Sequence, residues 1–427
     1  MQNWQIKLSL FCNYFVFAVL LNSVGTVVLQ VQNTYGVSAS QASILEAFKD
    51  LSIAITSFLV ASFVVRIGYK RSMMAALALI SIMCLAMPHL PAFWMTKLLF
   101  LLIGVSFALT KVSVFATLSL VTDTSKQHAS LMNFLESFFM VGVLSGYFIF
   151  SHFVDDDNPQ STQWLQVYNV LASISIAALL LLAFTRVDEK AVHKPNHSGW
   201  AKDFTDMLAL CVKPLIFIFI ISAFLYVLIE QSIMSWLPTF NSRILQLPPS
   251  LSIQMASILA LSTAIGRFLA GVLLVRVDWF KVLSASLVLA ALLVLISLPL
   301  AERAQGHTTD SWSTAPLAAF IFPLIGLCLA PIYPAINSVI LTALPKYQHA
   351  AMAGLIVVFS ALGGTTGSII TGHLFEAFGG SVAFYCSLVP IAALLLSLFL
   401  FNRHTQRSNQ DKTERPTTNT DNAVLSE

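Results

Sequence analysis

Twelve long apolar segments, separated by short polar ones, run along almost the whole chain and constrain its fold more than any other feature. They lie near residues 8–31, 41–65, 72–92, 95–121, 129–154, 164–185, 212–240, 252–276, 281–300, 315–343, 349–375 and 381–402. Because about 20 apolar residues in a helix cross the hydrocarbon core of a bilayer, each segment predicts one transmembrane helix. Only 10% of the residues are charged, against roughly 25% in soluble domains. We therefore predict an all-α integral membrane protein and exclude a water-soluble fold.

The longest polar interruption follows the sixth apolar segment and divides the chain in two. We predict four parts: an N-terminal six-helix bundle at 1–185, a cytoplasmic linker at 186–211, a C-terminal six-helix bundle at 212–402 and a disordered cytoplasmic tail at 403–427. The tail has too few apolar residues to form a core of its own.

The two halves are similar in sequence. Residues Lys126–Phe153 align without a gap with Tyr347–Leu374, which places Gly142 on Gly363. A parallel repeat of this kind is typical of secondary transporters, whose two bundles rock about a site near the middle of the membrane. It is hard to reconcile with channels built by oligomerisation.

The distribution of basic residues predicts the orientation. Loops on the cytoplasmic side carry the excess of Lys and Arg, and most of the 23 Lys and Arg residues fall on one side if the N-terminus is cytoplasmic. We expect both termini on the cytoplasmic side of the inner membrane. The basic inner face then reflects membrane orientation, and no nucleic-acid partner is expected.

Several other classes of function have no support in the sequence. The five cysteines all lie in apolar segments without a C-x-x-C pair, so neither a disulfide framework nor a metal site is predicted. The chain has no phosphate-binding G-x-x-x-x-G-K-S/T loop and no H-E-x-x-H helix, so we do not expect an enzyme. No cofactor is expected, apart from a proton as the coupling ion.

Four stretches carry a family resemblance. Residues Ala61–Arg71, after the second segment, are similar to the signature G-x-x-x-D-R-x-G-R followed by Lys or Arg, and Gly266–Gly271 is a degenerate second copy. Tyr226–Trp236 and Gly326–Ser338 are similar to the seventh and tenth spans of hexose transporters. Together they resemble the major facilitator superfamily, and more narrowly its fucose–galactose–hexose proton symporter branch.

The resemblance implies two pseudo-symmetric six-helix bundles and a gating-loop motif. The motif residues retained here are Arg66, Gly68, Lys70 and Arg71. The signature aspartate is replaced by Val65, so the ion pair that it makes in many relatives is missing. The acid that takes part in proton coupling in the fourth span of fucose symporters also has no counterpart in Phe107–Lys111.

Seven charged residues fall within the predicted spans at a distance from their ends. They are Glu46, Lys49, Asp50, Lys111, Glu136, Glu230 and Arg267. An ionisable side chain at the bilayer centre costs about 2.5–3.5 kcal/mol on insertion scales, so such residues usually face a wet cavity or a partner. They are therefore the first candidates for a functional site.

Glu46, Lys49 and Asp50 are spaced to share one face of a helix. One interpretation is a structural triad that fixes the second span against the eleventh. The other is a proton or substrate site, because one lysine leaves a carboxylate to spare. Glu46, Asp50 and Glu230 are our candidates for proton coupling.

The other charges have two interpretations each. Lys111 either pairs with Glu136 or contacts the solute directly, and Glu230 belongs either to a sugar site or to a hydrogen-bond cluster between helices. Arg267 either bonds helix-end carbonyls near the inner gate, which is the leading interpretation, or forms an ion pair or contacts the solute. The candidates for lining the cavity are polar or aromatic residues on cavity-type spans, namely Asn22, Gln231, Trp236, Tyr333 and Asn337.

The leading hypothesis is a proton-coupled symporter for a small polar solute, such as a sugar or sugar derivative. The alternatives are an efflux antiporter for drugs or metabolites and a transporter-derived solute sensor. The expected partners are the solute and the lipid bilayer, and we expect a monomer.

Overall fold

The structure is a computed structural model, and it describes residues 2–120, 125–185, 209, 211–304, 311–344 and 349–414. Every regular element in these ranges is a helix. Eleven helical segments are long and apolar enough to cross a membrane. The remaining predicted span is the 24-residue helix α4, which carries three of the buried charges. Each of the twelve predicted spans thus coincides with one helix or with a few consecutive ones.

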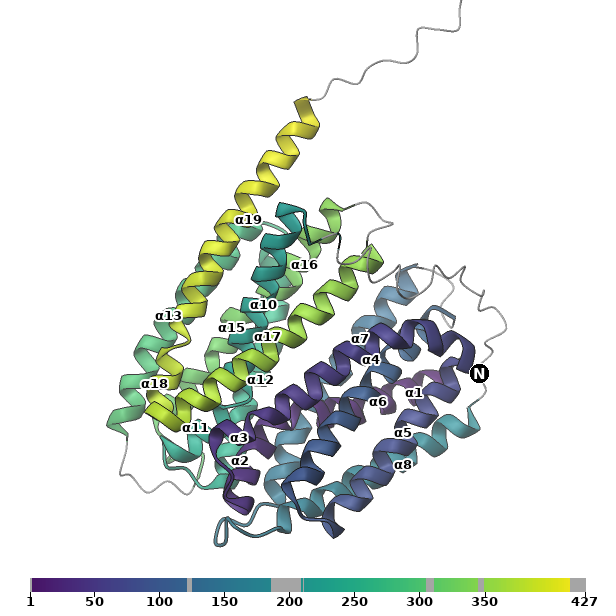
Figure 1. The fold of residues 1–427 in the computed structure, drawn as a ribbon, viewed down its shortest axis with the longest axis vertical. Helices are drawn as coiled ribbons and strands as arrows, with labels where there is room; N and C mark the ends of the chain where they lie inside the picture. The colour runs from purple at the N-terminus through teal and green to yellow at the C-terminus, as the bar shows by residue number, and fades with distance from the viewer. Residues whose placement is uncertain are drawn as a thin grey trace, which may run out of the picture.

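The first half of the chain forms one group of helices (Figure 1). They are α1 (Gln2–Asn22), α2 (Val24–Tyr35), α3 (Ala39–Ala42), α4 (Ile44–Ile67), α5 (Tyr69–Ala86), α6 (Phe93–Leu120), α7 (Ser125–His152) and α8 (Val167–Phe184), with 3-10 turns at Met87–His89 and Gln163–Gln166. Within the group, α6 packs on α4 and α5, and α1 packs on α7 and α8. The break between α1 and α2 falls at Ser23, whose Oγ donates to the Leu20 carbonyl at 2.7 Å and so competes with the helix ladder.

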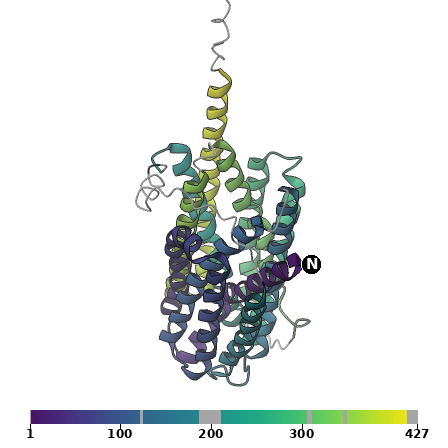
Figure 2. The same cartoon turned by 90° about the vertical axis from the view of Figure 1, so that its right-hand side faces the viewer.

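The second half forms a corresponding group, drawn in green to yellow in Figure 1. Its helices are α10 (Pro214–Met234), α11 (Leu237–Arg243), α12 (Pro249–Leu273), α13 (Trp279–Arg303), α14 (Leu317–Ile321), α15 (Ile325–Leu329), α16 (Ile332–Ala343), α17 (His349–Phe378), α18 (Gly380–Tyr385) and α19 (Leu388–Glu414), with a 3-10 turn at Phe322–Leu324. The span made of α14, α15 and α16 is interrupted where Pro323 and Pro331 cannot donate a backbone hydrogen bond. Most helices run roughly along the long axis of the molecule (Figure 2).

The aligned glycines of the two halves occupy equivalent places. A Cβ on Gly142 would lie 2.7 Å from the Cβ of Ala18, so α7 approaches α1 closely there. A Cβ on Gly363 would overlap the carbonyl oxygen of Phe224, so α17 approaches α10 in the same way. Small residues allow such approaches between membrane helices, and the sequence repeat therefore corresponds to a repeat in packing.

The end of the chain differs from the prediction. Helix α19 continues to Glu414, well into the segment that was expected to be disordered from residue 403, and it projects beyond the other helices (Figure 1). The polar stretch contains neither Gly nor Pro before Pro416, so nothing in it interrupts the helix, whereas the residue before a proline is disfavoured in one. The linker residues 186–208 and 210 and the tail residues 415–427 lie outside the described residues.

Candidate functional site

A cavity of about 590 Å³ lies between the two halves. The first half contributes residues of α1, α4, α6 and α7 to its wall, and the second half contributes residues of α10, α12, α15, α16 and α17. Its charged lining residues are Asp50, Lys111, Glu230 and Arg267, and its polar ones include Asn22, Ser57, Gln231, Thr263, Tyr333 and Ser360. Four of the seven charges predicted inside the spans therefore face one cavity.

The triad of α4 is an ion-paired cluster. Lys49 is 4% exposed and pairs with Oε1 of Glu46, which is fully buried, and its Nζ lies 3.4 Å from Oδ1 of Asp50. The i, i+3 and i+4 spacing places the three side chains together, as the sequence predicts. Asp50 is the member that reaches the cavity.

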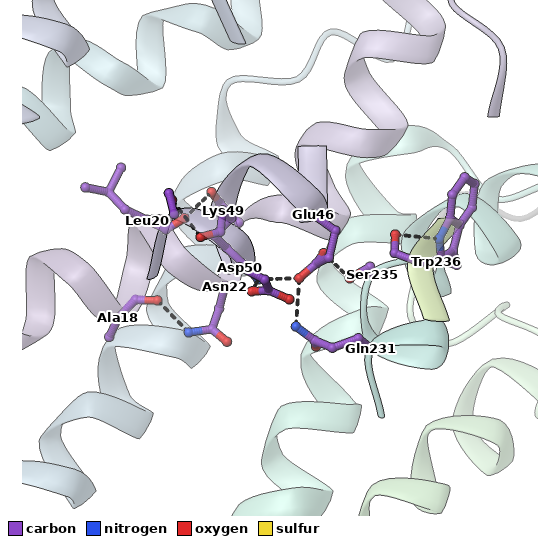
Figure 3. A network of polar contacts seen from close by, with 12 residues as sticks. Ala18, Leu20, Asn22, Glu46, Lys49, Asp50, Gln231, Ser235 and Trp236 are labelled. Atoms are coloured by element: carbon purple, nitrogen blue, oxygen red, sulfur yellow. Dashed lines mark hydrogen bonds and ion pairs between the residues drawn. The ribbon is translucent and has the colours of Figure 1, made fainter. Parts of the chain in front are cut away.

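Glu46 also joins the two halves (Figure 3). Gln231 Nε2 donates to its Oε1 and Ser235 Oγ donates to its Oε2, both at 2.7 Å and both from the span that begins with α10. Together with Lys49, three donors converge on one carboxylate, which fits its acceptor-only character when ionised. Asp50 approaches α17 as well, because a Cβ on Gly364 would overlap its Oδ2.

The two cavity cations, Lys111 and Arg267, form no ion pair with a carboxylate of the described residues. In the described part of the chain, ion pairs between side chains are those of Lys49. Lys111 Nζ lies 5.7 Å and 5.9 Å from the ring centroids of Phe107 and Phe115. The predicted partner Glu136 is exposed on α7, does not line the cavity and forms no ion pair with Lys111.

Arg267 does not occupy the helix-end position of the leading interpretation. It lines the cavity, and its Nη1 is 3.9 Å from Sδ of Met140, which belongs to the opposite half. The structure shows no hydrogen bond from Arg267 to helix-end carbonyls within the described residues. The reason is that residue 267 lies on the face of α12 that turns towards the first half, four residues after the lining residue Thr263.

Glu230 is half-buried and accepts a hydrogen bond of 2.7 Å from Tyr226 Oη. The Tyr226 ring stacks on Tyr333 at a centroid distance of 5.4 Å, and the Tyr333 hydroxyl is 2.8 Å from Ser360 Oγ. One wall of the cavity therefore combines an acid, an aromatic face and hydroxyl groups, which are the groups used in sugar sites.

The predicted cavity residues separate into two groups. Asn22, Gln231 and Tyr333 line the cavity, whereas Trp236 and Asn337 do not. Trp236 is fully buried, stacks on Phe375 and donates to Ser368 Oγ at 3.2 Å, so it packs the second half. Asn337 is half-buried on α16, one turn after Tyr333. Both were chosen for residue type, which does not distinguish the cavity face of a helix from its packed face.

Sequence reasoning also missed several lining residues. Ser57, Thr263 and Ser360 line the cavity together with apolar residues such as Phe139 and Met140. Helical spacing could have identified two of them. Ser57 follows Asp50 by two helical turns and Thr263 precedes Arg267 by one, so each shares a helix face with a candidate charge. Among the described residues, no three His, Cys, Asp or Glu side chains are grouped so as to hold a metal ion.

The gating-loop motif forms the turn between α4 and α5. Gly68 has φ = 97°, a conformation that L-residues with a side chain rarely adopt, so this position requires glycine. Lys70 Nζ donates to the Ala183 carbonyl at 2.8 Å and ties the turn to the end of α8, while Arg71 is exposed. The side chain of Arg66 lies outside the described residues.

Hydrogen bonds join the two halves at the end of the molecule that lies opposite this turn. We call that end the closed end. Asp156 in the loop after α7 accepts from Ser250 N at the start of α12 at 2.8 Å and from Ser250 Oγ. Glu376 near the end of α17 accepts from Ser40 N of α3 at 3.0 Å. In each case an acid at the closed end of one half accepts a hydrogen bond from the start of a helix in the other half.

A protein with two packed groups of membrane helices and one charged cavity between them has the architecture of a secondary transporter. The chain matches the sequence profile of the Major Facilitator Superfamily over residues 8–308 and 281–426, and it belongs to this family. The resemblance inferred from its motifs is confirmed.

Solved structures of the same fold are distant in sequence. The nucleoside transporter NupG is 16% identical with a TM-score of 0.71, covering 94% of this chain and 98% of that one. A D-xylose–proton symporter is 13% identical with a TM-score of 0.72, and the match covers 93% of this chain and 97% of the symporter. FucP in its outward conformation is 16% identical with a TM-score of 0.60, and the match covers 95% of this chain and 99% of FucP. None of the curated protein sequences compared with this chain matches it.

Proposed function

We propose that this transporter is a proton-coupled symporter for a small polar solute, such as a sugar or sugar derivative, in the inner membrane. The observation that carries the proposal is the cluster of Glu46, Lys49 and Asp50, which joins the halves and also reaches the cavity. A proton arriving there changes both the charge of the cavity and the contact between the bundles. That is what coupling by alternating access requires.

Asp50 is the best proton acceptor of the three candidates. Glu46 is fully buried and accepts from three donors, and Glu230 accepts from the Tyr226 hydroxyl. Asp50 contacts a lysine that already bonds Glu46, and it borders the cavity through which protons arrive. Protonation of Asp50 therefore disturbs fewer contacts than protonation of Glu46, and Lys49 keeps its bond to Glu46.

The proposed state of the structure is inward-facing. The positive-inside distribution of Lys and Arg places the α4–α5 turn in the cytoplasm, so the closed end is the extracellular end. Solute in this state would exchange with the cytoplasm.

The wall of the cavity also supports a second candidate. Phe115, Phe139, Met140 and Met234 line it beside the charged residues, and flexible Met and aromatic surfaces are typical of sites that accept varied apolar compounds. An efflux antiporter for drugs or metabolites would use such a wall.

Uptake into proteoliposomes separates the candidates. Symport predicts that an inward proton gradient drives the accumulation of sugars or sugar derivatives and that a protonophore abolishes it. Accumulation that ignores the gradient would contradict proton coupling, and proton-driven movement in the opposite direction would favour the antiporter. Binding without any flux would favour a sensor.

A further inference from the structure

Two positive charges face the cavity from opposite halves. Lys111 projects from α6 of the first half and Arg267 from α12 of the second, and both side chains are exposed to the space that the cavity occupies. Neither has a carboxylate within ion-pair distance among the described residues. An unpaired cation inside a membrane span is costly. We therefore expect each of these two cations to bind a ligand.

The neighbours of the two cations do not neutralise them. The rings of Phe107 and Phe115 near Lys111 offer only their π faces, and the contact of Arg267 with Met140 is to a neutral sulfur. Glu136 on α7 is exposed and acts on Lys111 electrostatically, but it lies outside the cavity wall and is beyond ion-pair distance of both cations. Both cations therefore remain available to an anion.

The acids of the cavity have other partners. Asp50 contacts Lys49, and Glu230 accepts from Tyr226. Counted with the buried pair of Glu46 and Lys49, the site has three acids and three bases, so it is neutral when all are ionised. One proton on Asp50 leaves a single positive charge in excess, and one bound monoanion restores neutrality.

From this charge balance we infer that the solute is a hydroxylated organic monoanion, such as a sugar acid, with its carboxylate held between Lys111 and Arg267. Asn22, Gln231 and Tyr333, which line the same cavity, bind its hydroxyl groups. A guanidinium and an ammonium are the side chains that form charge-assisted hydrogen bonds to carboxylates. The inference rests on the proposed symport and names its substrate class.

The geometry also gives a reason for coupling. Because the two cations belong to different halves, a carboxylate bound to both draws the halves together around it, as closure of the inner side requires. Transport of one proton with one monoanion moves no net charge, whereas transport of one proton with a neutral sugar does.

Binding tests the site directly. Radiolabelled D-glucuronate and D-glucose are titrated against the purified full-length protein. We expect glucuronate to bind, and Lys111→Gln and Arg267→Gln each to weaken binding at least about tenfold, because each removes one partner of a buried charge pair. The conservative variant Lys111→Arg should bind more tightly than Lys111→Gln. The control Lys97→Gln removes a cation from the same helix α6 outside the cavity and should change nothing.

Three results would overturn the inference. They are equal binding of glucose and glucuronate, unchanged glucuronate binding in both glutamine variants, and no binding of D-glucuronate, D-galacturonate or D-gluconate to the wild-type protein. Size-exclusion profiles of the variants establish that each is folded before titration.

Flux on a solid-supported membrane separates this inference from the proposed function. Glucuronate should drive proton uptake without a current. A current driven by neutral sugar, with no response to glucuronate, would contradict the anionic substrate and leave proton symport standing. Glucuronate binding that depends on Lys111 and Arg267, without any proton uptake, would contradict symport and leave the anion site standing.

Discussion

The buried acids of this transporter differ in how many partners their carboxylates have. Glu46 accepts from Lys49, Gln231 and Ser235, while Asp50 lies 3.4 Å from the lysine and borders the cavity. The same two turns of α4 thus hold one carboxylate that is fixed by its surroundings and one that is free to change its proton. This difference is the basis of the structural role proposed for Glu46 and the coupling role proposed for Asp50.

Replacement of Asp50 by Asn should separate coupling from translocation. The amide keeps the shape of the protonated acid, so we expect exchange of solute across a membrane to continue while accumulation driven by a proton gradient falls to the level of a protonophore control. In the same proteoliposomes, counterflow measures the exchange and gradient-driven uptake measures the accumulation. Asp157→Asn, an exposed change in the loop after α7, is the matched control. Loss of both activities together would contradict the coupling role.

Lys49 is expected to be the most sensitive residue for stability. Lys49→Met leaves two buried carboxylates without their cation, and breaking a buried ion pair costs about 3–5 kcal/mol. The midpoint temperature of thermal unfolding in detergent should fall strongly in Lys49→Met. Adding Glu46→Gln to the same chain should restore part of the lost stability by removing one uncompensated charge. An unchanged midpoint in Lys49→Met would show that the cluster does not stabilise the fold.

The repeat in the sequence becomes a repeat of helix contacts at the next scale. Helix α17 packs on α10 as α7 packs on α1, and across the halves α17 meets α4 while α12 meets α7. Asp156 follows α7 and accepts from the start of α12, and Glu376 near the end of α17 accepts from the start of α3. The closed end is thus held by two equivalent contacts.

Loss of both contacts should release the closed end. Each acid accepts a hydrogen bond across the two halves, so Asp156→Asn with Glu376→Gln should weaken both contacts and raise the population of molecules open at that end. In a background without the five native cysteines, Ile233→Cys in the cavity wall should then react faster with an impermeant reagent added from outside. Asp157→Asn should leave the rate unchanged. Equal rates in the double variant and its parent would contradict a latch role.

Sequence reasoning predicted the elements better than the site. The twelve spans follow from hydropathy, because lipid requires apolar helices of fixed length, and the triad of α4 follows from helical spacing. The rotation of each helix about its axis depends on tertiary packing, and for that reason Trp236 was placed in the cavity although it packs against Phe375. The bonds of Glu46 to Gln231 and Ser235 cross from one half to the other, and no local pattern encodes them.

At the scale of the whole molecule, hydrogen bonds of the described residues join the two halves at the closed end. The closed end has hydrogen bonds between Asp156 and Ser250 and between Ser40 and Glu376, and Arg243 reaches Asn33 at 3.4 Å. The cavity lies between the same halves. Two rigid bundles with contacts of this kind predict a second arrangement in which the closed end opens and the other end closes.

Spin-label distances at the two ends test this account most directly. One pair, Gln160→Cys with Glu302→Cys, reports on the closed end, and the other, Phe184→Cys with Lys281→Cys, reports on the end of the α4–α5 turn; all four positions are exposed. On lowering the pH in the presence of solute, we predict that the first distance lengthens while the second shortens. Distances that stay constant, or that change in the same direction at both ends, would contradict alternating access in this protein.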